Sequence, residues 1–233
     1  MKSVWVATLA IASAGSLAAR DLRKAVEVVT AETLTFSPGG TIRIDDSFGQ
    51  LNVEGWERDE VELRVVRRTQ WHYEPEDAWK AKQQLQRITV ETTRWGQDLT
   101  ILTRFPRPSL YLPFGGRSNL HMEYGIKVPR KATLRIRHSA GEVNVQGVDA
   151  SIDIQNKVGE VSLRLPDREG YDISAETKIG DVDSSLEGRT KRTRVFGASF
   201  SGSPRGGGKN VTVRVKVGMI YLGKWREPVS GRR

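Results

Sequence analysis

The chain has 233 residues, of which 37% are hydrophobic and 28% charged, which is enough apolar material for one folded domain or two small ones. With 23 glycines and 9 prolines, this composition excludes a collagen, a coiled coil and a fully disordered protein. The absence of cysteine excludes disulfides, thiolate catalysis, iron–sulfur clusters and cysteine-based zinc sites, and 37 bases against 28 acids give a net charge of +9.

Residues 1–18 predict an export signal. Lys2 precedes an apolar run over 4–12, and Ser16 and Ala18 satisfy the small-residue requirement of a cleavage site, so we expect cleavage after Ala18. An uncleaved anchor is the alternative, but the run is far shorter than the roughly 20 apolar residues that span a bilayer. Cleavage removes one base and no acid, and leaves a chain of charge +8 without a transmembrane segment, in the periplasm or at the cell surface.

The segments that follow are predicted to be mainly strands. Residues 19–33 form a tail or a first strand. Alternation of apolar and polar residues over 41–66 predicts three strands, with a turn at 45–49 between the first two.

One helix is expected over about 75–87, because proline stands at an early helical position, acids occupy the first turn and a base lies near the end. Alternation resumes over 88–93 and 98–104, which together predict a hairpin. A loop rich in proline and glycine follows over 106–119.

A glycine-centred repeat occupies the remainder of the chain, with one earlier copy. In each copy a glycine follows a mostly apolar residue and opens an alternating strand. The glycines recur roughly every 20 residues, with Gly197 dividing the longest interval, which is typical of a repeat array. Glycine suits such turns because it tolerates positive φ. The repeat glycines that we expect to be structural are Gly49, Gly141, Gly159, Gly180 and Gly218.

Two short strands per repeat cannot bury a core alone, but stacked copies bury a continuous column of Val, Ile and Leu. We therefore expect an all-β fold of stacked, right-handed, β-solenoid-like repeats of about 20 residues over 34–224, with one inserted α-helix and a C-terminal tail over 225–233. A plain antiparallel sandwich is the alternative, although a sandwich does not require a fixed period.

The segment 49–56, Gly-Gln-Leu-Asn-Val-Glu-Gly-Trp, is followed by Val-Glu-Leu at 61–63, the helical insert, Ile-Lys-Val-Pro at 126–129 and several Gly-acid-Val units. In this arrangement residues 34–224 resemble the bacterial DUF4097 putative adhesins and, more distantly, the GIN-type auto-transporter adhesin head domains. The resemblance implies an exported β-solenoid-like domain with an adhesive or envelope role, and it brings no catalytic residues. The unit at Gly197 departs from the pattern, because it lacks the acid.

The sequence contains no convincing catalytic or cofactor motif. The nearest match to the nucleophile elbow Gly-x-Ser-x-Gly, at 197–201, lacks the closing glycine, and the adjacency of His138 and Ser139 in a turn is not evidence of catalysis. A phosphate-binding loop is excluded because Ser203 and Asn210 occupy positions that need glycine and a serine or threonine. We expect no catalytic residue and no cofactor.

Glu142, Glu160 and Asp181 follow their glycines at equivalent positions, so in a solenoid they would form a column about 5 Å apart. Like charges at that spacing repel unless a calcium ion or neighbouring bases offset them. Calcium-binding β-rolls repeat the acid much more often, so we expect bases or solvent here rather than a metal.

The densest basic stretch consists of Arg189, Lys191, Arg192 and Arg194. Alternation places such bases on an outward face, where the simplest interpretation is a solvated strand. The functional interpretation is contact with an anionic envelope polymer or glycan, since export makes acidic glycans or lipid headgroups better partners than genomic nucleic acid.

The sequence therefore favours a non-enzymatic, exported binding or structural module of the bacterial cell envelope. The alternative is a glycan-acting enzyme on a β-helix scaffold, which would require facing carboxylates in a cleft. The oligomeric state and the identity of the ligand are left open.

Overall fold

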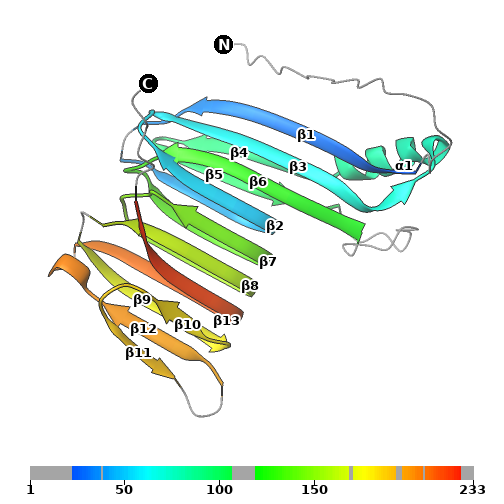
Figure 1. The fold of residues 1–233 in the computed structure, drawn as a ribbon. Helices are drawn as coiled ribbons and strands as arrows, with labels where there is room; N and C mark the ends of the chain where they lie inside the picture. Colours follow the sequence, from blue (N-terminus) through cyan, green and yellow to red (C-terminus); the bar gives the residue numbers. More distant parts are fainter. Residues whose placement is uncertain are drawn as a thin grey trace, which may run out of the picture.

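The computed structural model describes residues 23–37, 39–106, 119–167, 170–192, 196–206 and 208–226. Most of these residues lie in strands that join into one sheet, and one α-helix is found among them (Figure 1). The prediction of an all-β fold with an inserted helix is confirmed. The predicted export signal, residues 1–18, lies outside the described residues.

The strands are, in chain order, β1 (Lys24–Thr35), β2 (Thr41–Trp56), β3 (Glu60–Tyr73), β4 (Thr89–Trp95), β5 (Asp98–Arg104), β6 (Leu120–Pro129), β7 (Thr133–Gln146), β8 (Ile152–Pro166), β9 (Tyr171–Ile179), β10 (Val182–Ser184), β11 (Arg189–Arg192), β12 (Ala198–Gly202) and β13 (Lys209–Trp225). Helix α1 (Pro75–Gln86) separates β3 from β4, and a short 3₁₀ segment covers Pro204–Gly206. The path across the sheet is β1-β3-β6-β2-β7-β8-β13-β9-β12-β11, with β10 paired to β13, β5 to β2 and β4 to β5.

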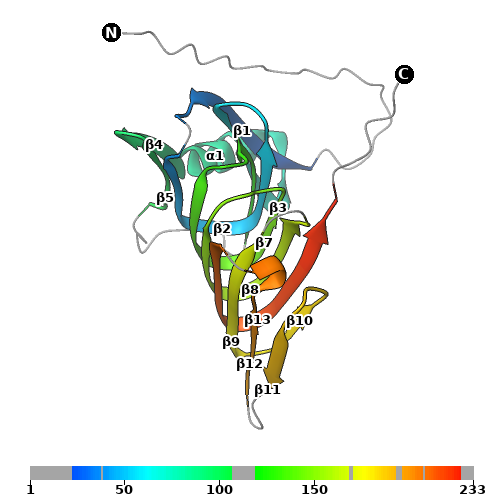
Figure 2. The ribbon, with the colours of Figure 1, turned by 90° about the vertical axis from the view of Figure 1, so that its left-hand side faces the viewer.

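The long strands β2, β7, β8 and β13 each bend midway at a glycine, so that each has two legs that curve around a common interior (Figure 2). In β2 the core-facing residues are Ile42 and Ile44 on the first leg and Leu51 and Val53 on the second. The inward positions change from even to odd numbers because the corner interrupts the alternation. The turn expected at 45–49 is therefore a corner within one strand and not a connection between two strands.

The five repeat glycines stand next to one another at these corners. Gly49, Gly141, Gly159 and Gly218 share one register across β2, β7, β8 and β13, and Gly180 lies against Gly218. All five have positive φ, between 94° and 140°. On each of the last four glycines along the chain, an added Cβ atom would lie 1.8–2.0 Å from the carbonyl oxygen of a neighbouring repeat glycine. The corners thus require glycine both for the backbone angle and for close stacking.

Buried polar side chains lie inside the corners, three residues before the repeat glycines. Each donates a hydrogen bond to the carbonyl oxygen of the repeat glycine on the neighbouring strand, which removes the penalty of a buried carbonyl without a partner. The pairs are His138 Nε2 with Gly49 O at 3.1 Å, Asn156 Nδ2 with Gly141 O at 3.3 Å and Thr177 Oγ1 with Gly218 O at 3.1 Å. Val215 occupies the equivalent position of β13 and has no polar atom to donate.

The strand order differs from a stack of successive coils. Strands β5 and β6 lie beside the two legs of β2, and β7 lies on the other side of β2, so β2 separates β6 from its successor in the chain. In the same way β13 separates β8 from β9. Pairing becomes antiparallel toward both edges, as between β3 and β6 or β9 and β12. Parallel pairing of the bent strands accounts for the regular spacing of the glycines in the sequence. The sheet is not closed and its strands do not follow chain order, so the predicted right-handed solenoid is not confirmed.

Helix α1 packs against β1 and β3 and buries Ala81 and Leu85. The predicted hairpin is confirmed by the antiparallel pairing of β4 with β5. Within the described part of the chain, no helix has both the length and the apolar character needed to cross a membrane.

Candidate binding surfaces

The predicted basic stretch lies on the edge strand β11, and its bases do not gather on one surface. Strand alternation directs Arg189 and Lys191 to one side and Arg192 to the other. Arg192 Nη2 lies 2.7 Å from Asp181 Oδ2. The hydrogen bond from Arg192 lowers the pKa of Asp181, and the same bond raises the pKa of Arg192. Arg194 lies outside the described residues.

The expected column of three acids is wrong in its third member. Glu142 and Glu160 are neighbours in register, but Met219 of β13 stands between Glu160 and Asp181. The inserted strand therefore separates two repeats that are consecutive in sequence. Among the described residues, no group of three or more His, Asp or Glu side chains is arranged to hold a metal ion.

His138 contacts a serine that the sequence pattern did not single out. Its Nδ1 atom lies 2.8 Å from Ser47 Oγ, while Nε2 is bonded to the carbonyl of Gly49. Both side chains are buried, so the Ser47 hydroxyl cannot reach a substrate. Burial lowers the pKa of His138 to about 4, which keeps the imidazole neutral near pH 7. The pair therefore belongs to the corner and is not a catalytic dyad.

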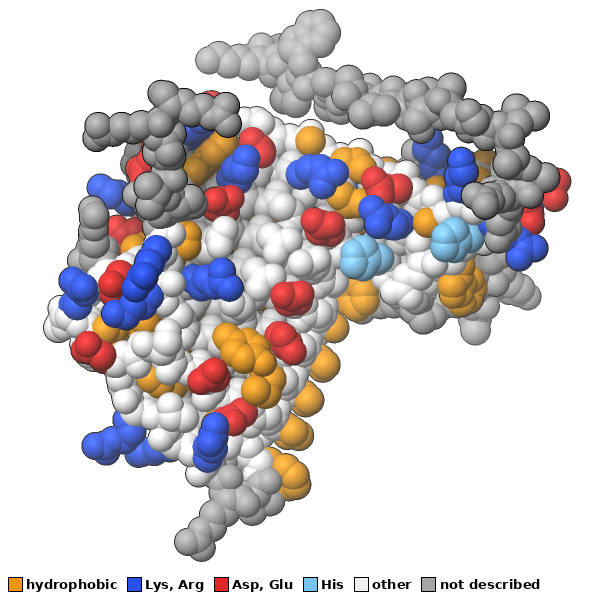
Figure 3. Space-filling model, viewed as in Figure 1, with side chains coloured by type: hydrophobic (Ala, Val, Ile, Leu, Met, Phe, Trp, Pro, Cys, Tyr) orange, Lys and Arg blue, Asp and Glu red, His pale blue; other side chains and the backbone are white. Residues whose placement is uncertain are grey.

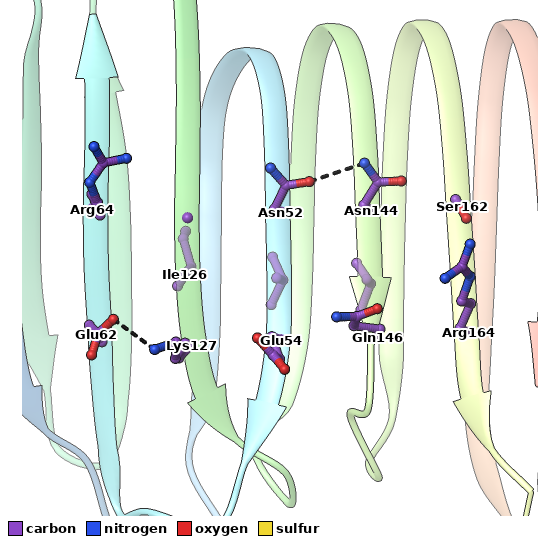
Figure 4. A pocket seen from close by; sticks show the side chains of 13 residues that line it. Asn52, Glu54, Glu62, Arg64, Ile126, Lys127, Asn144, Gln146, Ser162 and Arg164 are labelled. Carbon is purple, nitrogen blue, oxygen red and sulfur yellow. Dashed lines mark hydrogen bonds and ion pairs between the residues drawn. The ribbon is translucent and has the colours of Figure 1, made fainter. Parts of the chain in front are cut away.

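A shallow groove of about 550 Å³ crosses the outer face of the second legs (Figure 4). Five adjacent strands line it, in the order β3, β6, β2, β7 and β8, which gives it a length of about 19 Å at the usual strand spacing. Each strand contributes one residue to each of two outward rows, which together we call the polar groove. The first row is Arg64, Gly125, Asn52, Asn144 and Ser162, and the second is Glu62, Lys127, Glu54, Gln146 and Arg164.

Some side chains of the polar groove are bonded to each other. Asn144 Nδ2 donates to Asn52 Oδ1 at 3.1 Å, and Lys127 Nζ lies 3.1 Å from Glu62 Oε1.

Other members of the groove are unpaired. Within the described residues, the side chains of Arg64, Glu54, Gln146 and Arg164 make no hydrogen bond or ion pair. The two arginines stand at opposite sides of the groove (Figure 4), so a stretch of amide and hydroxyl groups separates two available guanidinium groups.

Gly125 leaves a gap in the first row. A Cβ atom at this position would have no heavy atom within 4 Å, and the backbone is not in the left-handed region. The buried side chains of Val53 and Ile126 point the other way, into the core. The exposed ring of Tyr221 on β13 extends the first row beyond Ser162. The centre of the groove is thus open, and one end carries an aromatic side chain.

A second hollow, of about 410 Å³, lies on the outer face of the first legs, next to the corners. Lys157, Lys216 and Lys178 occupy equivalent positions on β8, β13 and β9, and Arg137 and Arg214 line the same hollow. We call these five bases the basic edge. The acids that line this hollow are Asp46 and Glu176.

Both surfaces follow a pattern in the sequence that appears when equivalent repeat positions are compared. The tripeptide Lys-Val-Gly or Lys-Ile-Gly ends at Gly159, Gly180 and Gly218, and its lysines form the row of the basic edge. In the polar groove, residues three and five positions after a repeat glycine supply the members from β2, β7 and β8. Arg64 and Gly125 lie on strands outside the repeat and carry no such signal.

No protein-family model matches the chain, so the resemblance to the DUF4097 family has no such support, and no curated protein matches it. The matches among solved structures include a "putative cell adhesion protein" from Clostridium sporogenes, at 18% identity and a TM-score of 0.48, covering 85% of this chain and 100% of that one. A "putative adhesin" from Parabacteroides merdae is 8% identical with a TM-score of 0.26, over 67% of this chain and 62% of that one. Another from Bacteroides fragilis is 6% identical with a TM-score of 0.24, over 85% and 97%.

Proposed function

We propose that the protein is an exported, non-enzymatic binding module of the cell envelope, and that its polar groove binds an acidic glycan. The observation that carries this proposal is the alignment of amide, hydroxyl and guanidinium groups in two outward rows around the gap at Gly125. This surface replaces the Arg189–Arg192 segment as the candidate contact for an anionic polymer, because alternation divides that segment between two sides of an edge strand.

The chemistry of the groove fits the groups of a sugar chain. Sugar hydroxyls both donate and accept hydrogen bonds, as do the amides of Asn52, Asn144 and Gln146. The unpaired guanidinium groups of Arg64 and Arg164 are suited to bidentate contact with carboxylates. A groove about 19 Å long accommodates several sugar units of a chain rather than a single one.

The groove does not provide the carboxylate pair that glycoside hydrolysis needs. Lys127 stands between Glu54 and Glu62 in register and is paired with Glu62. Retaining glycosidases place two carboxyl groups about 5 Å apart, and inverting ones place them about 6.5–9.5 Å apart with room for a water molecule between them. Here Lys127 lies between the two acids and forms an ion pair with one of them. Binding without cleavage is therefore the better assignment.

The test is titration calorimetry of the mature chain with polygalacturonate, an acidic polysaccharide, and with neutral dextran. We expect binding of polygalacturonate that weakens as salt increases, and weaker binding of dextran. Gly125→Trp should reduce the affinity at least tenfold and leave the melting temperature nearly unchanged, because the indole fills open space. Thr190→Trp, at an exposed position of the edge strand β11, is the matched control and should bind like the parent.

Two results would overturn the proposal. Equal affinity of Gly125→Trp and the parent for polygalacturonate would show that the groove is not the site. The appearance of new reducing ends during incubation with polygalacturonate would show that the protein is a glycan-acting enzyme.

A further inference from the structure

Exposed apolar side chains follow one another along the corners of the sheet. Val158, Val217 and Ile179 share one register on β8, β13 and β9, and they are 51%, 42% and 50% exposed. Phe196 is 69% exposed and precedes Gly197, which lies against the backbone of β9. We call these four residues the apolar ridge. Figure 3 shows hydrophobic side chains in a line down one edge of the stack.

The corner itself explains why these side chains face outward. On the legs, alternation buries every second residue, but at the corner Lys157 and Val158 are both exposed because the positive φ of the next glycine resets the alternation. The ridge therefore follows from the same feature that builds the fold. A row of adjacent exposed Val and Ile side chains is unfavourable in water, and such rows are candidates for surfaces that meet a partner.

Bases predominate on one side of the ridge and acids on the other. Lys157, Lys216 and Lys178 directly precede the three ridge residues on β8, β13 and β9, and within the described residues none of these lysines forms an ion pair. The acids on the lysine side are Glu176 and Asp46. On the other side lie Glu142, Glu160 and Asp181, the last of which is paired with Arg192.

We propose that the apolar ridge and the basic edge together dock onto the surface of an anionic lipid bilayer. The ridge side chains enter the headgroup region and the lysines contact lipid phosphates, so that apolar burial and electrostatic attraction add. Tilting of the protein toward the lysine side keeps Glu142 and Glu160 in water.

The shape and chemistry favour a bilayer over a soluble anionic polymer. A polymer would neutralise the lysines but leave the ridge in water, whereas a lipid surface satisfies both rows at once. The strands of the ridge are hydrogen-bonded to one another on both sides of the corner, so its insertion exposes few unpaired backbone groups to the lipid. This surface uses different residues from the polar groove and is independent of the proposed glycan binding.

The first experiment is cosedimentation of the mature chain, from Ala19 on, with vesicles of phosphatidylcholine containing one quarter phosphatidylglycerol. The apolar run at 4–12 is omitted because it would bind lipid by itself. We expect binding that is lost with pure phosphatidylcholine vesicles and reduced by high salt. Replacement of Lys157, Lys178 and Lys216 by Gln should weaken binding on the order of a hundredfold, since each base near an anionic surface contributes roughly fivefold.

A matched control removes the same number of charges elsewhere. Arg58→Gln, Lys131→Gln and Arg226→Gln combined should retain most of the vesicle binding, because these exposed bases lie at the ends of the legs, far from the corners that carry the ridge. Equal loss in the two triple variants would overturn the proposal, since net charge alone would then explain the binding.

The ridge is tested by Val158→Ser, Ile179→Ser and Val217→Ser combined, which changes no charge. Binding to the anionic vesicles should fall at least tenfold. If this variant bound vesicles like the parent while the lysine variant lost binding both to vesicles and to dextran sulfate, the basic edge would be a site for anionic polymers and the membrane assignment would be wrong.

Depth of insertion is read directly, because the chain has no cysteine of its own. A single cysteine at Val158, labelled with an environment-sensitive fluorophore, should shift its emission to the blue on addition of anionic vesicles. The same label at Tyr221, on the groove face, should not respond. A response at Tyr221 and none at Val158 would overturn the orientation.

Discussion

Each corner glycine combines a left-handed backbone with contact against the neighbouring strand, so two separate penalties fall on any side chain placed there. For Gly159→Val we expect a loss of about 3 kcal/mol or more in the free energy of unfolding, because φ is +121° and the added Cβ would lie 2.0 Å from Gly141 O. Urea denaturation followed by circular dichroism measures the loss.

The matched control is Gly125→Val, the same substitution at a strand glycine with no atom within 4 Å of its Cβ position. Its free energy of unfolding should stay within about 1 kcal/mol of the parent, and a β-branched residue in a strand is favourable in itself. Similar losses in both variants would mean that the corners do not limit the stability of the fold.

His138 links the corner of β7 to the stability of the protein in acid. Its pKa is about 4 in the folded chain and about 6.5 when unfolded, so the unfolded state binds more protons between these values. The stabilising contribution is therefore complete above about pH 6.5 and is lost as the pH falls through about 4. The loss should be on the order of 3 kcal/mol, measured as the free energy of unfolding across this range.

The effect of His138 can be isolated by replacing it with asparagine. Asn156 holds the equivalent position on β8, and its side-chain amide donates a hydrogen bond to a glycine carbonyl. His138→Asn keeps a donor for Gly49 O but cannot titrate, so its stability should depend less on pH between 4 and 6.5. The carboxyl groups whose pKa is lowered, such as that of Asp181, titrate below this window. Parallel pH profiles of the two proteins would refute the role of His138.

Strand β13 is the last strand in the sequence, but in the sheet it lies between β8 and β9. It forms parallel pairs with β8 along most of its length and with β9 along its first leg, while β10 pairs with its second leg. Removal of residues 209–233 should therefore expose two strand edges in the middle of the sheet and cause aggregation and loss of cooperative thermal unfolding. Removal of residues 227–233 alone, beyond the described chain, should leave the melting temperature within a few degrees of the parent.

Local patterns predicted most elements and failed at their order. Alternation located the strands, proline and charge located α1, and a polar turn located the β4–β5 hairpin. The glycine period makes Gly159 and Gly180 appear adjacent, whereas Gly218 lies between them. The order of strands depends on pairing between residues far apart in the chain, and a period read along the sequence holds no information about insertion of a distant strand.

Local sequence composition did not predict the basic edge, for a related reason. The density of bases along the chain indicated Arg189, Lys191 and Arg192, but a strand divides consecutive residues between two sides of the sheet. The bases that do gather, Lys157, Lys178 and Lys216, are about 20 or more residues apart and meet through register. Comparison of equivalent repeat positions would have found them, whereas local composition could not.

In the whole molecule, one bent sheet carries surfaces of different chemistry on its two outer faces. The polar groove lies on the second legs, and the basic edge lies on the first legs near the corners. Both consist of side chains on paired strands rather than on loops, so the spacing of their groups is fixed by the backbone ladder. A ligand can therefore occupy the polar groove while the basic edge stays accessible to a second partner.

The central position of β13 also determines when the protein can finish folding. Translation of residues 180–225, from the end of β9 to the end of β13, takes roughly 2–9 s at the usual rate of 5–20 residues per second, and throughout that interval β8 and β9 lack the strand that joins them. The ribosome thus releases β8 and β9 before the sheet between them can be completed. Such a delay is compatible with the export proposed above, because a chain without its central strand is still extended enough to pass through a translocation channel.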